Sequence, residues 1–403
     1  MTVIIGFESS CDETAVAVVV NGRKVLSNAI ASQIAKHAVY GGVVPELAAR
    51  EHLTAIRRVT DESLKEAGVT TDQIDAVAVT NGPGLVPALL VGVNFAKGFA
   101  AAYKKPLIGI NHFLGHIYGV FLDQEEDVFA KKELFPMVGL VVSGGHTSLV
   151  LIREDGTANV IGTTLDDAAG EAFDKAAKML NLGYPGGPVI EKAARNGDPH
   201  RFSFPRSLTG TAGKALAPEN RFNFSFSGVK TALLYHAKKI CGENTEALDG
   251  QDLYDTLASY QDAIVGVLCE KAFDAARFFH AKSLILCGGV ACNGCLREHF
   301  EAGAPKNVKV LLAPRKYCTD NAAMIAGLAC RYYRAGEFAD MSLDAYARTE
   351  SRAISSNRDK NWRFRRAASM KVEMIPTVPS TASSFSCSIR ERSRWIGRNI
   401  TSR

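Results

Sequence analysis

Short apolar and β-branched runs alternate with turn signals along the first part of the chain. Asn21-Gly22, between two such runs, is a strong hairpin signal. Pro45 and Gly68 are a typical start and stop for a helix, and a second, apolar helix is expected between the turn at residues 81–84 and about Tyr103. The runs predict five strands, at residues 3–8, 14–20, 24–30, 76–80 and 107–110.

The same pattern then begins again. It predicts five more strands, at residues 137–142, 147–152, 159–164, 283–287 and 308–312. Helices are expected at residues 167–180, at 251–280 as one or two helices, and at 320–334. Two successive units of antiparallel strands followed by helix and strand indicate an internal duplication. This is the layout of the α/β actin-like or sugar-kinase-like fold, in which two lobes enclose a nucleotide.

This fold predicts a division of the chain into three parts. Residues 1–110 would form a first lobe, completed by a closing helix within about 319–349, and residues 111–318 a second lobe. Residues 350–403 are rich in Ser and Arg, lack apolar periodicity and are expected to be disordered. A solvated extension and an RNA-binding arm both remain open for this tail.

Composition and charge narrow the class of protein. Of the 403 residues, 47% are hydrophobic and 22% charged, as in proteins with a packed core, and no apolar run reaches the roughly 18 residues of a membrane span. The start lacks a basic, apolar leader and the nine cysteines are scattered, so we expect a cytoplasmic protein. The net charge of +5 arises in residues 351–403, which hold twelve Lys/Arg and three Asp/Glu. A nucleic-acid partner therefore does not follow from bulk charge.

Two histidines have the spacing of metal ligands. His112 and His116 would lie on one face of a helix, one turn apart, where both can reach one ion. The alternative is two unrelated histidines. A metalloprotease is excluded because Phe113 stands where that motif needs a glutamate base. Asp320 could supply a third ligand or cap the last helix. The Cys292/Cys295 pair is too little for a zinc site.

Glycine-rich turns and one acidic turn form a second set of candidates. Glycines let backbone N–H groups approach phosphate oxygens, and four such turns in a duplicated frame favour a phosphate-binding cleft. They lie at residues 82–84, 143–145, 184–188 and 287–289. Residues 8–14 place acidic groups between the first two strands, where they could face phosphate through a cation or transfer protons.

Together these motifs resemble one known family over residues 3–349, the universal tRNA adenosine threonylcarbamoyltransferases, once called O-sialoglycoprotein endopeptidases. The matching motifs are Glu8-Ser9-Ser10-Cys11-Asp12-Glu13-Thr14, Gly82-Pro83-Gly84-Leu85, Asn111-His112-Phe113-Leu114-Gly115-His116, Val142-Ser143-Gly144-Gly145-His146-Thr147, Phe173-Asp174-Lys175, Tyr184-Pro185-Gly186-Gly187-Pro188, Phe224-Ser225-Phe226-Ser227-Gly228-Val229-Lys230-Thr231, Gly288-Gly289-Val290 and Thr319-Asp320-Asn321-Ala322. Val141 and His146 resemble the bacterial members. Pro87 and Cys292 depart from the family pattern, and residues after about 350 match nothing in it.

The resemblance implies a function and a set of site residues. Members take L-threonylcarbamoyl-AMP and transfer its acyl group to N6 of adenosine 37, in tRNAs reading codons that begin with A, releasing AMP. His112, His116 and Asp320 would bind one divalent metal, Fe²⁺ before Zn²⁺. The adenylate would lie against nine residues: Val141, Val142, Ser143, Gly144, Gly145, Asp174, Gly187, Glu191 and Asn293. Bacterial members work with a paralogous actin-like subunit and a small ATPase.

The chemistry needs a group that takes or relays a proton from the adenine amine. Asp12 and Glu13 are the candidates, because acidic residues that face a phosphate either need a cation between them or serve in proton transfer. Two other functions remain as alternatives on this fold: an ATPase or kinase, and a nucleotide-dependent scaffold without catalysis.

Overall fold

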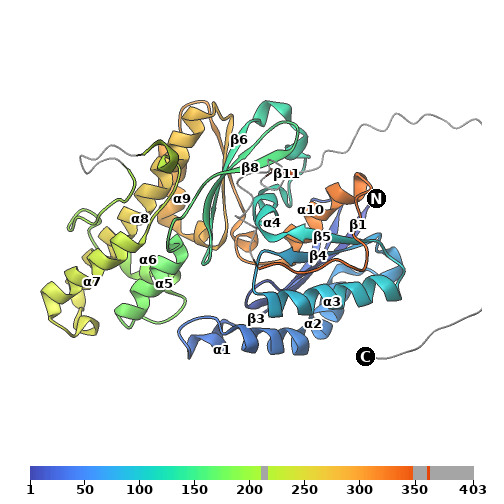
Figure 1. The fold of residues 1–403 in the computed structure, drawn as a ribbon, viewed down its shortest axis with the longest axis horizontal. Coiled ribbons are helices and arrows are strands. Elements are labelled where there is room, and N and C mark those ends of the chain that lie inside the picture. The colour runs from blue at the N-terminus through green and yellow to red at the C-terminus, as the bar shows by residue number, and fades with distance from the viewer. Residues whose placement is uncertain (210–216, 348–360, 364–403) are drawn as a thin grey trace, which may run out of the picture. The chain divides into compact units, whose positions relative to one another are not determined.

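The computed structural model of the chain describes residues 1–209, 217–347 and 361–363, and its strands form two mixed sheets (Figure 1). The first sheet has the order β3-β2-β1-β4-β5. Its strands are β1 (Val3–Glu8), β2 (Glu13–Val20), β3 (Lys24–Ser32), β4 (Ala76–Gly82) and β5 (Leu107–Asn111). β1, β2 and β3 pair antiparallel in sequence, whereas β1, β4 and β5 run parallel.

The second sheet repeats this arrangement in the order β10-β9-β6-β7-β8-β11. Its strands are β6 (Met137–Val142), β7 (Thr147–Ile152), β8 (Thr157–Thr163), β9 (Ser283–Cys287), β10 (Lys309–Leu312) and β11 (Asn361–Arg363). β6, β7 and β8 pair antiparallel as β1, β2 and β3 do, and β9 and β10 take the parallel places of β4 and β5. The predicted duplication is therefore confirmed.

Ten α-helices accompany the sheets in the described residues. They are α1 (Ile34–Ala38), α2 (Pro45–Ala67), α3 (Val86–Ala102), α4 (His112–Tyr118), α5 (Ala169–Met179), α6 (Gly186–Ala194), α7 (Ser227–Cys241), α8 (Gly250–Phe278), α9 (Gly294–Gly303) and α10 (Ala322–Arg334). The region left open as one or two helices is the single helix α8. Pro87, a departure from the family pattern, lies in the first turn of α3, where proline fits. The helices α1, α7 and α9 were not predicted.

Both faces of the first sheet are covered, which explains its continuous apolar strands. Along β1, Ile5 and Phe7 pack in one core with α2 and α3, and the alternate Ile4 packs in another that includes α10. Figure 1 shows α2 and α3 below this sheet and α10 above it. The start of α10 lies very close to β1, because a Cβ on Gly6 would stand 2.8 Å from the carbonyl oxygen of Ala322.

The segment after α10 returns to the first sheet. Ala339 forms an isolated antiparallel bridge with Leu107, and the hydroxyl of Tyr346 donates to the carbonyl of Gly82 at 3.0 Å. We propose that the two sheets mark two lobes divided near residues 110 and 318, with α10 and this segment belonging to the first. The predicted disorder of residues 350–403 lies outside the described residues, except that 361–363 form β11, which pairs with β8.

Candidate metal and adenylate site

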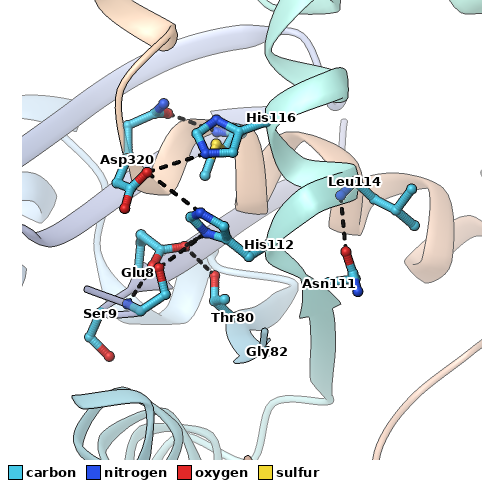
Figure 2. A network of polar contacts seen from close by, with 12 residues as sticks. Glu8, Ser9, Thr80, Gly82, Asn111, His112, Leu114, His116 and Asp320 are labelled. Atoms are coloured by element: carbon cyan, nitrogen blue, oxygen red, sulfur yellow. Dashed lines mark hydrogen bonds and ion pairs between the residues drawn. The ribbon is translucent and has the colours of Figure 1, made fainter. Parts of the chain in front are cut away.

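The two histidines occupy a short helix that begins directly after β5. Asn111 caps α4, its side-chain oxygen accepting from the Leu114 N–H at 3.0 Å. His112 and His116 are buried one turn apart, with their ring centroids separated by 4.6 Å (Figure 2). The predicted i, i+4 pair on one helix face is therefore present.

Asp320 reaches the pair from just before α10. Its Oδ1 lies 3.5 Å from Nε2 of His112 and 3.2 Å from Nε2 of His116 (Figure 2). The expectation that Asp320 could cap α10 is wrong: Asn321 is the cap and accepts from the Met324 N–H at 3.0 Å. With the cap supplied by the next residue, the Asp320 carboxylate points at the imidazoles instead.

The donor set fits a metal ion. Nδ1 of His116 is buried without a hydrogen-bond partner, and Nε2 is buried with the Asp320 carboxylate at 3.2 Å as its contact; leaving a buried polar group unpaired costs about 1–3 kcal/mol. Within the part of the chain that the structure describes, His112, His116 and Asp320 are the one group of three or more such side chains with ligand atoms within 4.8 Å of one another. A divalent ion held by these side chains would bind Nε2 of His116 beside the Asp320 carboxylate.

Glu8 lies behind His112 and was not predicted as a site residue. Its Oε2 is 3.0 Å from Nδ1 of His112, and its other contacts are the Ser10 N–H at 2.6 Å and the Thr80 hydroxyl. A carboxylate on the far ring nitrogen fixes the tautomer that offers Nε2 to a metal. The sequence showed the acidic turn, but it did not show the contact between Glu8 and His112, because these residues are 104 positions apart.

Charge at the site calls for a cation. Burial opposes ionisation of Glu8 and Asp320, yet the neighbouring imidazoles hold the pKa of both carboxyls below its usual value. Burial acts to lower the pKa of His112, but Glu8 and Asp320 outweigh it and raise that pKa well above its usual value. Two buried carboxylates thus favour positive charge between them, and a metal binding there would displace the imidazole proton.

The acidic turn carries two further carboxyls. Asp12 is buried, and Oε1 of Glu13 accepts from the Ser32 hydroxyl at 3.2 Å. Burial, aided by the charges of Asp320 and Asp12, raises the pKa of Glu13 to about 9. The same turn that supports His112 therefore places Glu13 within the electrostatic reach of Asp320.

The glycine turn of the second sheet lies near the metal ligands. Burial, followed by the charges of His112 and His116, lowers the pKa of His146 to about 4. His146 closes the turn, because its carbonyl accepts from the Ser143 N–H at 2.8 Å. A Cβ on Gly144 or on Gly145 would meet no atom within 4 Å. Val141 and Val142 are buried in β6, so they could contact a ligand only through the backbone.

The remaining candidates form two linked pairs around α6. Oδ1 of Asp174 accepts from the Gly186 N–H at 2.7 Å, beside Gly187, whose Cβ position is open. Oε1 of Glu191 accepts from the Gly294 N–H at 3.1 Å, next to Asn293. A cavity of about 340 Å³ is lined by Glu191 and Gly294, among others, and by Gln261, which accepts from the Asn293 amide at 2.8 Å.

A family model for tRNA N6-adenosine threonylcarbamoyltransferase matches residues 24–327, more than half of the chain. The chain belongs to the tRNA N6-adenosine threonylcarbamoyltransferase family. Curated members include proteins from Symbiobacterium thermophilum, 50% identical over 85% of this chain and 95% of that protein, and from Syntrophus aciditrophicus, 46% identical over 86% and 97%. The resemblance seen in the motifs is confirmed.

Solved structures show the same fold at low identity. HypF of T. kodakarensis is 15% identical with a TM-score of 0.53, over 85% of this chain and 49% of that one. Full-length HypF in its phosphate- and nucleotide-bound form is 12% identical with a TM-score of 0.51, over 84% and 47%. These likenesses and the duplicated sheets confirm the two-lobed actin-like fold.

Family membership makes the chain an acyltransferase that transfers a threonylcarbamoyl group to N6 of an adenosine in tRNA. In this threonylcarbamoyltransferase, His112, His116 and Asp320 converge on a group suited to a divalent metal. The Cys292/Cys295 pair forms no such group, since the Cys292 thiol contacts the Arg315 carbonyl at 3.6 Å and the Cys295 thiol lies 3.4 Å from Nδ1 of His299. Of the helices in the described ranges, none is long and apolar enough to cross a membrane.

Proposed function

We propose that the enzyme takes L-threonylcarbamoyl-AMP as donor and modifies N6 of adenosine 37 in tRNAs that read codons beginning with A, releasing AMP. The observation that carries this proposal is the convergence of the buried His112 and His116 rings on the Asp320 carboxylate, near an open glycine turn. A metal site near an open glycine turn suits a substrate that is both an acyl group and an adenylate.

The metal we propose is one Fe²⁺ ion, with Zn²⁺ as the second choice. Two imidazoles and one carboxylate are the ligand set of non-haem Fe²⁺ sites, and they leave positions open for substrate. Zinc accepts the same donors. When bound, the ion supplies Lewis-acid polarisation of the carbamoyl carbonyl. Glu8 holds His112 in the tautomer that this role needs.

We assign the adenylate to the residues of the second sheet and α6. Backbone N–H groups of Gly144, Gly145 and Gly187 are proposed to hold the phosphate, because no side chain fills the space above these glycines. Val141, Val142 and Ser143 are proposed to line the same site from the end of β6. Asp174 fixes the start of α6 through Gly186. Glu191 and Asn293 are placed at the nucleoside end, beside the cavity of about 340 Å³, a volume within the range of small-ligand pockets.

The transfer step consists of one bond formed and one broken. The adenine N6 amine attacks the carbamoyl carbon, the new C–N bond forms, and the bond from that carbon to the phosphate oxygen breaks, so that AMP leaves. Asp12 is proposed to accept the proton released by the amine. Glu13 is the weaker acceptor, since its raised pKa keeps it protonated at neutral pH. The charges of Asp320 and Asp12 contribute to that raised pKa, so a cation bound nearby would lower it.

We further propose that the enzyme works with two other proteins, a paralogous actin-like subunit and a small ATPase. These partners are expected from the bacterial character of Val141 and His146 within the family. The tRNA substrate itself follows from family membership.

The test is nucleoside analysis of tRNA from cells depleted of the protein and supplied with variants. Wild type should restore threonylcarbamoyladenosine, and His116→Ala should not, with its metal content falling from about one ion to none. His280→Asn is the matched control, because this exposed histidine has a φ of 51°, which asparagine tolerates. If His116→Ala restored the modification, or if the purified protein hydrolysed ATP without tRNA or metal, the proposal would be wrong.

A further inference from the structure

A buried histidine on α2 contacts the acidic turn. His52 is fully buried, although the other buried residues of this helix are mostly small or aliphatic. Its Nε2 lies 3.0 Å from the carbonyl oxygen of Cys11, and its Nδ1 lies 2.7 Å from the hydroxyl of Thr14. The two contacts stand on either side of Asp12 and Glu13.

The contacts define the state of the ring. A carbonyl oxygen only accepts, so Nε2 of His52 must carry the hydrogen and donate to Cys11. Nδ1 is then the acceptor in the neutral ring, and the Thr14 hydroxyl donates to it. Burial lowers the pKa of His52, which agrees with a neutral ring that holds this single tautomer.

A second group fixes the next peptide of the turn. The N–H of Gln33 donates to the carbonyl of Asp12 at 3.0 Å, so the carbonyls of Cys11 and Asp12 are both held. The Gln33 side chain is fixed in turn, because its Nε2 donates to the Ala48 carbonyl at 3.4 Å and its Oε1 lies 3.0 Å from Nε2 of His37. The carbonyl of each of the two peptides that flank Asp12 thus has a buried partner.

We propose that His52 is a positioning residue for the transfer reaction, holding the backbone on both sides of the Asp12 carboxylate in the orientation that receives the amine proton. This proposal rests on the proposed role of Asp12. The printed contacts of His52 are with Cys11 and Thr14 of the turn and with the side chain of Gln33, whose Nε2 lies 3.4 Å from Nδ1 of His52, so His52 acts through the turn and through the residue that holds the Asp12 carbonyl. A general base must lie within hydrogen-bond reach of its proton, and a shift of about 1 Å can cost about a hundredfold in rate.

The experiment measures steady-state transfer from L-threonylcarbamoyl-AMP to unmodified tRNA by the full-length chain together with its partner subunits. In His52→Leu, kcat should fall by about a hundredfold, while metal content and the KM for both substrates stay within about twofold of wild type. His52→Gln places an amide N–H near the position of Nε2 and can still donate to Cys11, so it should recover about tenfold of the loss. Thr14→Val, which removes the second contact only, should give an intermediate kcat.

Ser63→Ala is the matched control for a loss of packing. Ser63 is buried on the same helix and its hydroxyl lies 2.7 Å from that of Ser27, away from the acidic turn. It should lower thermal stability about as much as His52→Leu and leave kcat within about twofold. A His52→Leu enzyme with wild-type kcat, or one whose kcat loss is matched by lost metal or by Ser63→Ala, would overturn the proposal.

The design separates this inference from the proposed function. If Asp12→Asn itself leaves kcat unchanged, the assigned proton acceptor is wrong and the role of His52 fails with it. If Asp12→Asn lowers kcat but His52→Leu does not, Asp12 keeps its role and only the positioning inference fails.

Discussion

The turn between β1 and β2 and the turn between β6 and β7 are equivalent in the duplicated fold, and each is four residues long, 9–12 and 143–146. Their chemistry is opposite. The first is almost wholly buried and carries Asp12, whereas the second presents Gly144 and Gly145 to open space. The duplicated fold therefore has a buried acidic turn in the first sheet and an open glycine turn at the equivalent place in the second sheet.

The difference follows from what packs against each turn. Ser9 donates to the Ala88 carbonyl at 3.0 Å, and the Ser10 carbonyl accepts from the Leu85 N–H at 2.8 Å, so the start of α3 closes one side of the first turn. His52 closes the other side. A buried turn can hold carboxylates at fixed positions near a cation, and an open glycine turn can leave N–H groups for an anion. On the proposed function, the duplicated turns would serve a cation and an anion of one substrate.

The largest effect is expected from removing the charge of the first turn. Asp12→Asn should lower kcat by about a hundredfold or more, because a general base contributes about 10²–10⁴-fold to rate. Metal content should be unchanged, since Asp12 is not among the three converging ligands. Single-turnover transfer measured with bound donor checks this directly. A variant that loses its metal together with kcat would move Asp12 from proton transfer to metal binding.

The next effect concerns the residue that opens the first turn. Glu8→Gln keeps the size of the side chain but removes the charge next to Nδ1 of His112. Metal affinity should fall by about 10- to 100-fold, as for other partners of ligating histidines. Competition with a chelator followed by elemental analysis measures it. Metal affinity equal to that of wild type would show that the carboxylate does not act on His112.

A smaller effect is expected when the second turn is closed. Gly144→Val adds a side chain where a Cβ meets nothing, so the fold should persist while the adenylate loses space. Affinity for a non-hydrolysable analogue of the donor should fall by about tenfold, which is about 1.4 kcal/mol, without a change in metal content. Gly98→Val on α3 also enters open space and serves as the control. Equal binding by both variants, measured by calorimetry, would contradict a phosphate at this turn.

The sequence predicted the strands and helices better than the contacts between residues that are far apart in the chain. Alternation and turn signals located both sets of strands, and the spacing of His112 and His116 predicted their shared helix face, because these are local properties. The role of Glu8 was missed, since its contact with His112 joins the end of β1 to the end of β5. The choice between ligand and cap for Asp320 also needed the structure, because Asn321 could cap equally well.

Missed helices have a similar explanation. The start of α9 carries a readable signal, since Asn293 accepts from the Leu296 N–H at 2.9 Å and Leu296 and Phe300 are buried one turn apart. Its ten residues are dominated by glycine, charge and cysteine, which hides the apolar stripe. His52 was equally hidden, because a buried histidine on a polar helix gives no periodic signal until the turn it contacts is known.

The smallest effect is expected from the cysteines next to the adenylate residues of the second sheet. Cys292→Ser, Cys295→Ser should keep metal content and kcat within about twofold of wild type, because a lone CxxC does not complete a metal site. The structure gives the two thiols different partners, the Arg315 carbonyl and His299, so the substitution breaks no shared contact.

Cys11→Ser in the first turn is the comparison for this double variant. Its thiol is hydrogen-bonded to Asp12, and burial with the charges of Asp12 and Asp320 holds its pKa well above the usual value. A serine there changes a neighbour of the proposed base, and kcat should fall more than in the double variant. The same assay and elemental analysis serve both. If the double variant lost its metal while Cys11→Ser kept wild-type metal content and kcat, the Cys292/Cys295 pair would take part in metal binding, and the first turn would not take part in the reaction.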